Sequence, residues 1–174
     1  MSETAQGGAT DPNEAQAQQP RFAVLAQYVK DLSFENPRAP ASLQPRESRP
    51  SINVRVDVAS REFEAERYEV VLTIHVEATT AGETDFVVEL AYAGLFAVAN
   101  VPANAMSAVL MIEAPRLLFP FARRIVADTT RDGGLPPLMI DPIDFVALFR
   151  RRIEQQRAQQ QQADSAQPPE AGPN

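Results

Sequence analysis

The chain has 174 residues, and its 23 acidic residues outnumber the 16 basic ones, which gives a formal net charge of -7. It contains no Cys and one His, which excludes disulfides, thiol catalysis and a metal site built from several Cys or His ligands. The excess of acid argues against a nucleic-acid-binding surface. Composition therefore favours a protein that is not an enzyme and has no metal or cofactor.

The two ends of the chain differ from its middle. Residues 1–20 are small and polar and lack Lys and Arg, which indicates a disordered tail and not a signal peptide. Residues 154–174 are rich in Gln, Ala and Pro and indicate a second disordered tail, into which a helix can run. We expect one domain over residues 21–153. Because no apolar segment reaches ~18 residues, we expect a cytoplasmic protein that does not insert into a membrane.

The first half of the domain reads as strands, because apolar and polar residues alternate. We expect four strands, at Phe22–Phe34, Ile52–Val58, Tyr68–Ala78 and Glu83–Ala93, with a short turn containing Gly82 between the last two. In the last strand the alternation places Phe86, Val88, Leu90 and Tyr92 inward, and Asp85, Val87, Glu89 and Ala91 outward.

A long loop and a helical half complete the domain. Residues 36–50 contain four Pro and should form no regular structure; such long loops are usually functional or disordered. Helices are expected over Ala103–Ala114, with a break at Pro115, then from about Pro120 to Gly133. A last helix should begin with Asp141 as its N-cap. Strands followed by helices predict an α+β fold, with a four-stranded antiparallel sheet and helices on one face.

His75 is the single imidazole of the chain, and the alternation puts it on the solvent face of its strand, opposite Ile74. Catalysis by this group would need a partner, and the sequence has no Cys, second His or GxSxG motif. Glu62, Glu64 and Glu66 could form a hydrolase carboxylate pair, but solvated acids at a turn are far commoner. We therefore expect no enzyme activity.

Two further groups of residues have more than one interpretation. The basic run Arg150–Arg152 is interpreted as lying in the C-terminal half of the last helix, where its positive charges interact favourably with the helix dipole. Nucleic-acid binding is the weaker interpretation of that run, since no aromatic residues interleave with it. The apolar residues of the Pro-rich loop, of Leu117–Phe121 and of the last helix form either ordinary core or a groove that takes up extended apolar polypeptide.

Five blocks of sequence, in this order, resemble the SecB family of bacterial protein-export chaperones. They are YVKDLSFENPRAP at 28–40, YEVVLTIHVEA at 68–78, ETDFVVEL at 83–90, GLFAVANVP at 94–102 and APRLLFPFARRIVADTTRDGGLPPLMIDPIDFVALF at 114–149. The segment LFPFAR, followed by G-x-P-P-L and then P-x-D-F-x-A-L-F, is highly specific for that family. The resemblance spans residues 21–155.

The resemblance implies an ATP-independent holdase. Such a chaperone binds unfolded secretory precursor proteins in the cytoplasm, keeps them competent for translocation and delivers them to the ATPase SecA. It also implies a homotetramer that is a dimer of dimers, in which first strands pair and the longer helices pack between two sheets. The alternative is a small α+β ligand-binding protein or an oligomeric scaffold without chaperone activity.

The resemblance also assigns residues to surfaces. The SecA-binding face would comprise Asp31, Glu35, Val87 and Glu89. The client-binding groove, between the Pro-rich loop and the helices, would comprise Leu43, Phe119, Phe121, Phe145 and Phe149. Packing of the oligomer would depend on Val88, Leu90 and Tyr92. The Pro-rich loop departs from the family in having no aromatic residue, so weaker aromatic stacking with clients is expected.

Overall fold

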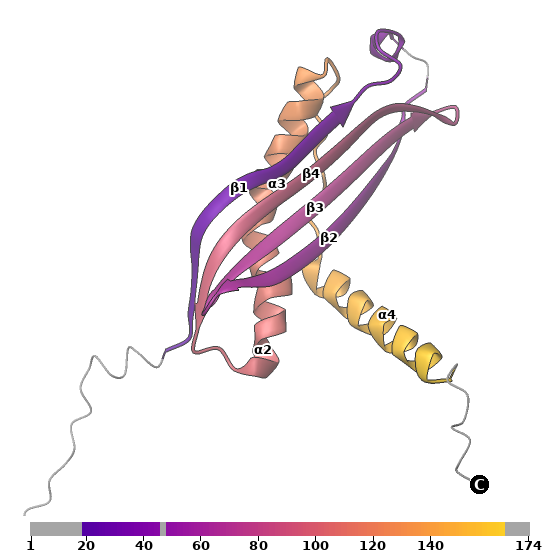
Figure 1. Cartoon of the computed structure of the whole chain (residues 1–174). Coiled ribbons are helices and arrows are strands. Elements are labelled where there is room, and N and C mark those ends of the chain that lie inside the picture. Colours follow the sequence, from indigo (N-terminus) through magenta and orange to yellow (C-terminus); the bar gives the residue numbers. More distant parts are fainter. Residues whose placement is uncertain (1–18, 46–47, 166–174) are drawn as a thin grey trace, which may run out of the picture.

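A computed structural model describes residues 19–45 and 48–165 of the chain. Its centre is a four-stranded antiparallel sheet made of β1 (Arg21–Glu35), β2 (Ser51–Glu64), β3 (Arg67–Thr80) and β4 (Glu83–Ala99). The strands lie in the order β1-β4-β3-β2, so β1 and β2 form the two edges (Figure 1). All four predicted strands are confirmed, and each is longer than the alternation alone indicated.

The predicted faces of the sheet are also confirmed, with one exception. Val70, Leu72, Ile74 and Val76 of β3 are fully buried on one face, and His75 lies on the other. Asp85 was expected to point outward, but only 3% of it is exposed. The register explains this: β3 and β4 slip between Ala78 and Thr79, so that Ala78 lies opposite Phe86 and Thr79 lies opposite Thr84, and the alternation changes phase at Asp85. A bulge of this kind re-aims a side chain.

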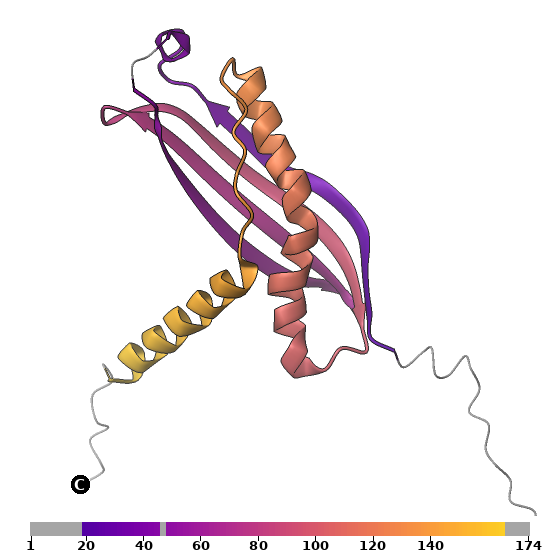
Figure 2. The same ribbon diagram turned by 180° about the vertical axis from the view of Figure 1, so that it is seen from behind.

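One continuous helical run covers the inner face of the sheet (Figure 2). It consists of α2 (Ala103–Ala108), a π-helical section η2 (Val109–Glu113) and α3 (Ala114–Asp132). The break predicted at Pro115 is wrong: the helical run continues through Pro115, which lies at the start of α3, directly after the π-helical section Val109–Glu113, where the hydrogen-bond pattern is already altered. Leu118 contacts β4 so closely that a Cβ on Gly94 would lie 2.8 Å from its side chain.

The helical run Ala103–Asp132 is, by length and composition alone, apolar enough to cross a membrane, with a mean hydropathy of 1.4 over 18 residues. The sequence reasoning expected no such segment. The structure accounts for part of the apolar composition, since Leu118, Ala122 and Val126 are fully buried in the layer between α3 and the sheet, whereas 39% of the apolar window as a whole is buried. Packing of this kind removes apolar side chains from water without a membrane.

The last helix, α4 (Phe145–Ser165), follows an extended segment and projects away from the sheet (Figure 1). Its cap is Asp144 and not the expected Asp141, because the Asp144 carboxylate accepts a hydrogen bond from the Ala147 N–H at 3.0 Å. The helix passes Ile153 and continues to Ser165, so the Gln-rich stretch is helical where a tail was expected from residue 154. The expected N-terminal tail lies outside the described residues up to residue 18.

Candidate functional site

The sheet has one face without a helix, which we call the outer face (Figures 1 and 2). Four residues predicted to bind a partner there, Asp31, Glu35, Val87 and Glu89, come from β1 and β4. The register pairs Glu35 with Val87, and it places Asp31 opposite Ala91. Since odd-numbered residues of these segments share one face, the structure brings all four together on the outer face.

A second row of polar residues on β3 extends this surface. Glu77 pairs with Val87, and His75 pairs with Glu89. The His75 Nδ1 lies 3.0 Å from a carboxylate oxygen of Glu89, whose side chain is 56% exposed. We call the group Asp31, Glu35, Glu77 and Glu89 the acidic patch. Its charges extend from the edge strand β1 across the two central strands, β4 and β3, which suits electrostatic steering of a basic partner.

Glu69 is the centre of a second cluster on the outer face, and the sequence reasoning missed it. Its carboxylate accepts hydrogen bonds from the Tyr28 hydroxyl at 2.5 Å, from the Lys30 ammonium at 3.0 Å and from the Arg61 Nε at 2.5 Å. Tyr28 and Lys30 lie on β1 and Arg61 on β2, so Glu69 connects both edge strands to β3. No local pattern identifies this cluster, because its members are up to 41 residues apart.

The environment of Glu69 changes its ionisation. The Arg61 hydrogen bond, followed by that from Tyr28, lowers the pKa of Glu69 from 4.5 to about 2, against the opposing effect of burial. Conversely, the hydrogen bond that Tyr28 donates to Glu69 raises the pKa of Tyr28, and the separate hydrogen bond that Arg61 donates to Glu69 raises the pKa of Arg61. The carboxylate is therefore ionised at neutral pH although only 4% of Glu69 is exposed.

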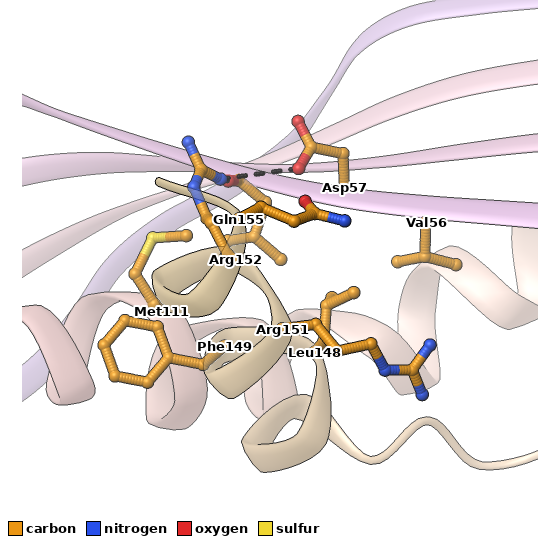
Figure 3. Close-up of a pocket in the computed structure, with 9 residues that line it drawn as sticks. Val56, Asp57, Met111, Leu148, Phe149, Arg151, Arg152 and Gln155 are labelled. Atoms are coloured by element: carbon orange, nitrogen blue, oxygen red, sulfur yellow. Dashed lines mark hydrogen bonds and ion pairs between the residues drawn. The ribbon is translucent and has the colours of Figure 1, made fainter. Parts of the chain in front are cut away.

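Pockets follow β2 along most of its length, and we call this series the β2 groove. An apolar pocket of about 510 Å³ lies between the Pro-rich loop, Ile52 and residues 135–138. Further along, a pocket of about 380 Å³ lies between β2 and α4 (Figure 3). Its walls include Val56 and Met111, with Phe149 and two arginines of α4. A third pocket continues past Ala59 towards α2.

The predicted client-binding residues are dispersed in the structure. Phe119 and Phe145 are buried and pack edge to face, with ring centroids 6.1 Å apart, so they belong to the core. Phe121 is exposed, and its ring lies 6.4 Å from that of Tyr92. Leu43 is exposed beside Gly134. Of the five, only Phe149 lines the β2 groove.

The residues predicted to govern oligomer packing lie on the inner face of β4. Val88 and Leu90 are fully buried, and Tyr92 is 7% exposed, with its hydroxyl 3.3 Å from the Gln27 side-chain oxygen. These residues support the helix layer within one chain. The β1 edge offers a different surface, since its exposed apolar residues, each 39% to 46% accessible, are Val24, Leu25, Tyr28, Val29 and Leu32.

Within residues 19–45 and 48–165, no group of three or more His, Asp or Glu side chains could hold a metal ion. Likewise, the single His contacts a carboxylate and no nucleophile. The described part of the chain presents three surfaces: an acidic patch, a groove with an apolar pocket beside Ile52, and an exposed edge strand.

Comparisons with known proteins agree with this picture. The family model for preprotein translocase subunit SecB matches residues 15–156. The protein-export protein SecB of Parvibaculum lavamentivorans is 58% identical over 153 residues, covering 88% of each chain. The SecB of Rhodopseudomonas palustris is 51% identical, over 93% of this chain and 98% of its own.

A solved structure shows the same fold. It is the Mycobacterium tuberculosis Rv1957 SecB-like chaperone in complex with a ChAD peptide from the Rv1956 HigA1 antitoxin. The match has a TM-score of 0.60 and covers 71% of this chain and 91% of that chain, at 18% sequence identity. The arrangement of sheet and helices is therefore shared with a structurally characterised SecB-like protein.

Proposed function

The chain belongs to the SecB family, and from that premise we propose how its surfaces divide the work of a protein-export chaperone. Members of the family are non-enzymatic chaperones, and this chain is one. We propose that it holds unfolded secretory precursors in the cytoplasm without ATP, keeps them competent for translocation and delivers them to SecA. The observation that carries the proposal is the apolar pocket of the β2 groove that lies beside the Pro-rich loop.

Client polypeptide would bind in the β2 groove. The pocket beside Ile52 is lined mainly by apolar residues, including Phe86 and residues 135–138. An unfolded chain exposes apolar side chains along an extended backbone, and an open apolar pocket can take up such side chains without requiring a specific sequence. The groove is lined mostly by residues that the resemblance did not assign, with Phe149 as the shared member.

SecA would bind at the acidic patch. A sheet surface with exposed carboxylates and a half-buried Val87 combines charge steering with apolar contact, which suits a basic partner segment. The patch lies on the outer face, whereas the β2 groove lies at one edge of the sheet beside the helices. Client and SecA could therefore bind together.

Four copies of the chain would assemble as a dimer of dimers. The β1 edge has free backbone groups and a row of exposed apolar side chains, which is a template for pairing with another strand. Exposed Leu117 and Phe121 on α3 would then be covered where helices pack between two sheets. Size-exclusion chromatography with light scattering should give about four chains per particle, and a stable monomer would contradict the assembly.

Refolding of a reduced, slow-folding secretory precursor tests the holdase activity. Excess protein should slow the refolding, and an unchanged rate would refute the proposal in favour of a ligand-binding or scaffold protein. Ile52→Asp should weaken this effect, because it puts a charge in the apolar pocket. Phe63→Asp is the matched control, since Phe63 is exposed on the same strand and lines none of these pockets.

A double variant separates the two binding surfaces. Asp31→Ala with Glu89→Ala should abolish measurable SecA affinity and leave client binding intact. Glu62→Ala with Glu64→Ala removes the same charge from the far end of β2 and should leave both intact. Equal loss of client and SecA binding in the first variant would contradict two separate surfaces.

A further inference from the structure

The two edge strands of the sheet differ in how well they can pair with a strand of another chain. The β1 edge is bordered by exposed apolar side chains. The β2 edge has charged residues on its outer face, such as Arg55 and Asp57, and a register slip between Glu62 and Glu64. Charges and bulges are the usual means by which a protein prevents an edge strand from pairing.

A third element, α4, contacts the middle of the β2 edge. The Arg152 guanidinium donates a hydrogen bond to the Val58 carbonyl oxygen at 2.5 Å, and the same nitrogen lies 3.4 Å from the Asp57 carboxylate (Figure 3). In an antiparallel strand, alternate residues direct both backbone groups to the same side. The carbonyls of Val54 and Val56 therefore face the free edge together with that of Val58, and Arg152 occupies the last of these.

Packing fixes Arg152 in this place. Phe145 is buried at the start of α4 and anchors the helix, and Leu148 and Phe149 line the pocket that faces Val56 and Met111. Val58 is the one buried side chain of β2, so the contact is made where β2 is held most firmly. Arg151, the preceding residue, lines the same pocket, but within the described residues it has no hydrogen-bond partner.

We propose that Arg152 closes the β2 edge against a second copy of this chain, and that it thereby restricts strand pairing between copies to β1. The inference rests on the proposed assembly through β1, which it makes more specific. A guanidinium on an edge carbonyl takes the acceptor that an incoming strand would need, and its positive charge would have to lose water in any new strand pair. The chain then has one open edge, so assembly closes at a defined size.

Arg152→Met is the test, because Met keeps the length and packing of the stem but removes the donors. In the full chain, light scattering at rising protein concentration should show about a two-fold or greater increase in mean molar mass over the wild type. Arg151→Met, with the same loss of charge on the same helix, should match the wild type. Adding Val54→Pro to Arg152→Met should restore the wild-type mass, since Pro removes a backbone N–H that faces the free edge.

The outcomes separate this inference from the proposed assembly. A tetrameric wild type with an Arg152→Met variant of equal mass at every concentration would overturn the role of Arg152 and leave the assembly intact. A monomeric wild type would refute assembly through β1. In that case, a rise in molar mass with concentration for the Arg152→Met variant, but not for the wild type, would still support closure of the β2 edge. A rise in molar mass of the Arg152→Met variant that Val54→Pro fails to reverse would also overturn the inference, because that association would not use the β2 edge.

Discussion

Glu69→Gln should destabilise the sheet, and more at neutral pH than in acid. The carboxylate accepts hydrogen bonds from Tyr28, Lys30 and Arg61, and it connects β1 and β2 to β3. Hydrogen bonds to a charged group contribute ~1.5–3 kcal/mol each. The Lys30 and Arg61 side chains are 43% and 61% exposed. Water can therefore replace much of the hydrogen bonding to Glu69 that these two side chains lose in the variant. We expect a loss of about 2–3 kcal/mol in the free energy of unfolding.

The pH dependence follows from the lowered pKa of Glu69. Its value is about 2 in the folded chain and 4.5 ordinarily, so the folded state favours the ionised form. That contribution to stability is fully present above pH 4.5 and is lost as the pH falls towards 2. Glu69→Gln removes the titrating group, and the stability difference from the wild type should therefore shrink in acid.

Urea unfolding followed by circular dichroism, at neutral pH and at about pH 3, measures both effects. Glu64→Gln is the matched control, because the Glu64 carboxylate forms an exposed ion pair with Arg67 and should cost less than about 1 kcal/mol. A stability difference for Glu69→Gln that does not change with pH, or a control that costs as much, would refute the role assigned to the cluster.

Two further substitutions test the helices, each against a neighbouring residue. Leu118→Ala should cost about 2–5 kcal/mol of unfolding free energy, because the Leu118 side chain is fully buried between α3 and the sheet. Leu117→Ala should cost little because Leu117 is 43% exposed; thermal unfolding compares the two variants, and equal costs would contradict the packing. Asp144→Ala should cost about 1 kcal/mol and reduce the helix signal of α4, whereas Asp141→Ala should change neither, and the reverse result would restore Asp141 as the cap.

The sheet could be predicted from sequence because its alternation is strict. A strand with one buried face must place every second residue inward, so Ile74 and His75 are assigned to opposite faces by position alone. The outward orientation predicted for Asp85 was wrong, because a bulge changes the phase of the alternation and the amino-acid composition gives no signal of it. The break at Pro115 was wrong for a related reason: whether a Pro ends a helix depends on which backbone groups the preceding turn uses.

The surfaces were less predictable, because they depend on which segments meet in space. The common face of the four predicted residues Asp31, Glu35, Val87 and Glu89 follows from the alternation along β1 and β4 once the register of the two strands is known. The sequence suggested Phe119 and Phe145 as groove residues, but in the structure their rings pack against each other in the core. Arg152 was interpreted through the helix dipole, yet α4 continues to Ser165, so the run lies in its first half.

The placement of Arg152 connects assembly with client binding. The pocket that contains it is part of the β2 groove, and the arginine fills the middle of the edge while the apolar pocket beside Ile52 stays open. A client bound there, as we propose, would contact apolar side chains more than backbone groups. Side-chain contacts of this kind tolerate many sequences and release readily, whereas a continuous strand pair would give tight, cooperative backbone bonding. Closing the β2 edge therefore favours a chaperone that binds precursors broadly and gives them up.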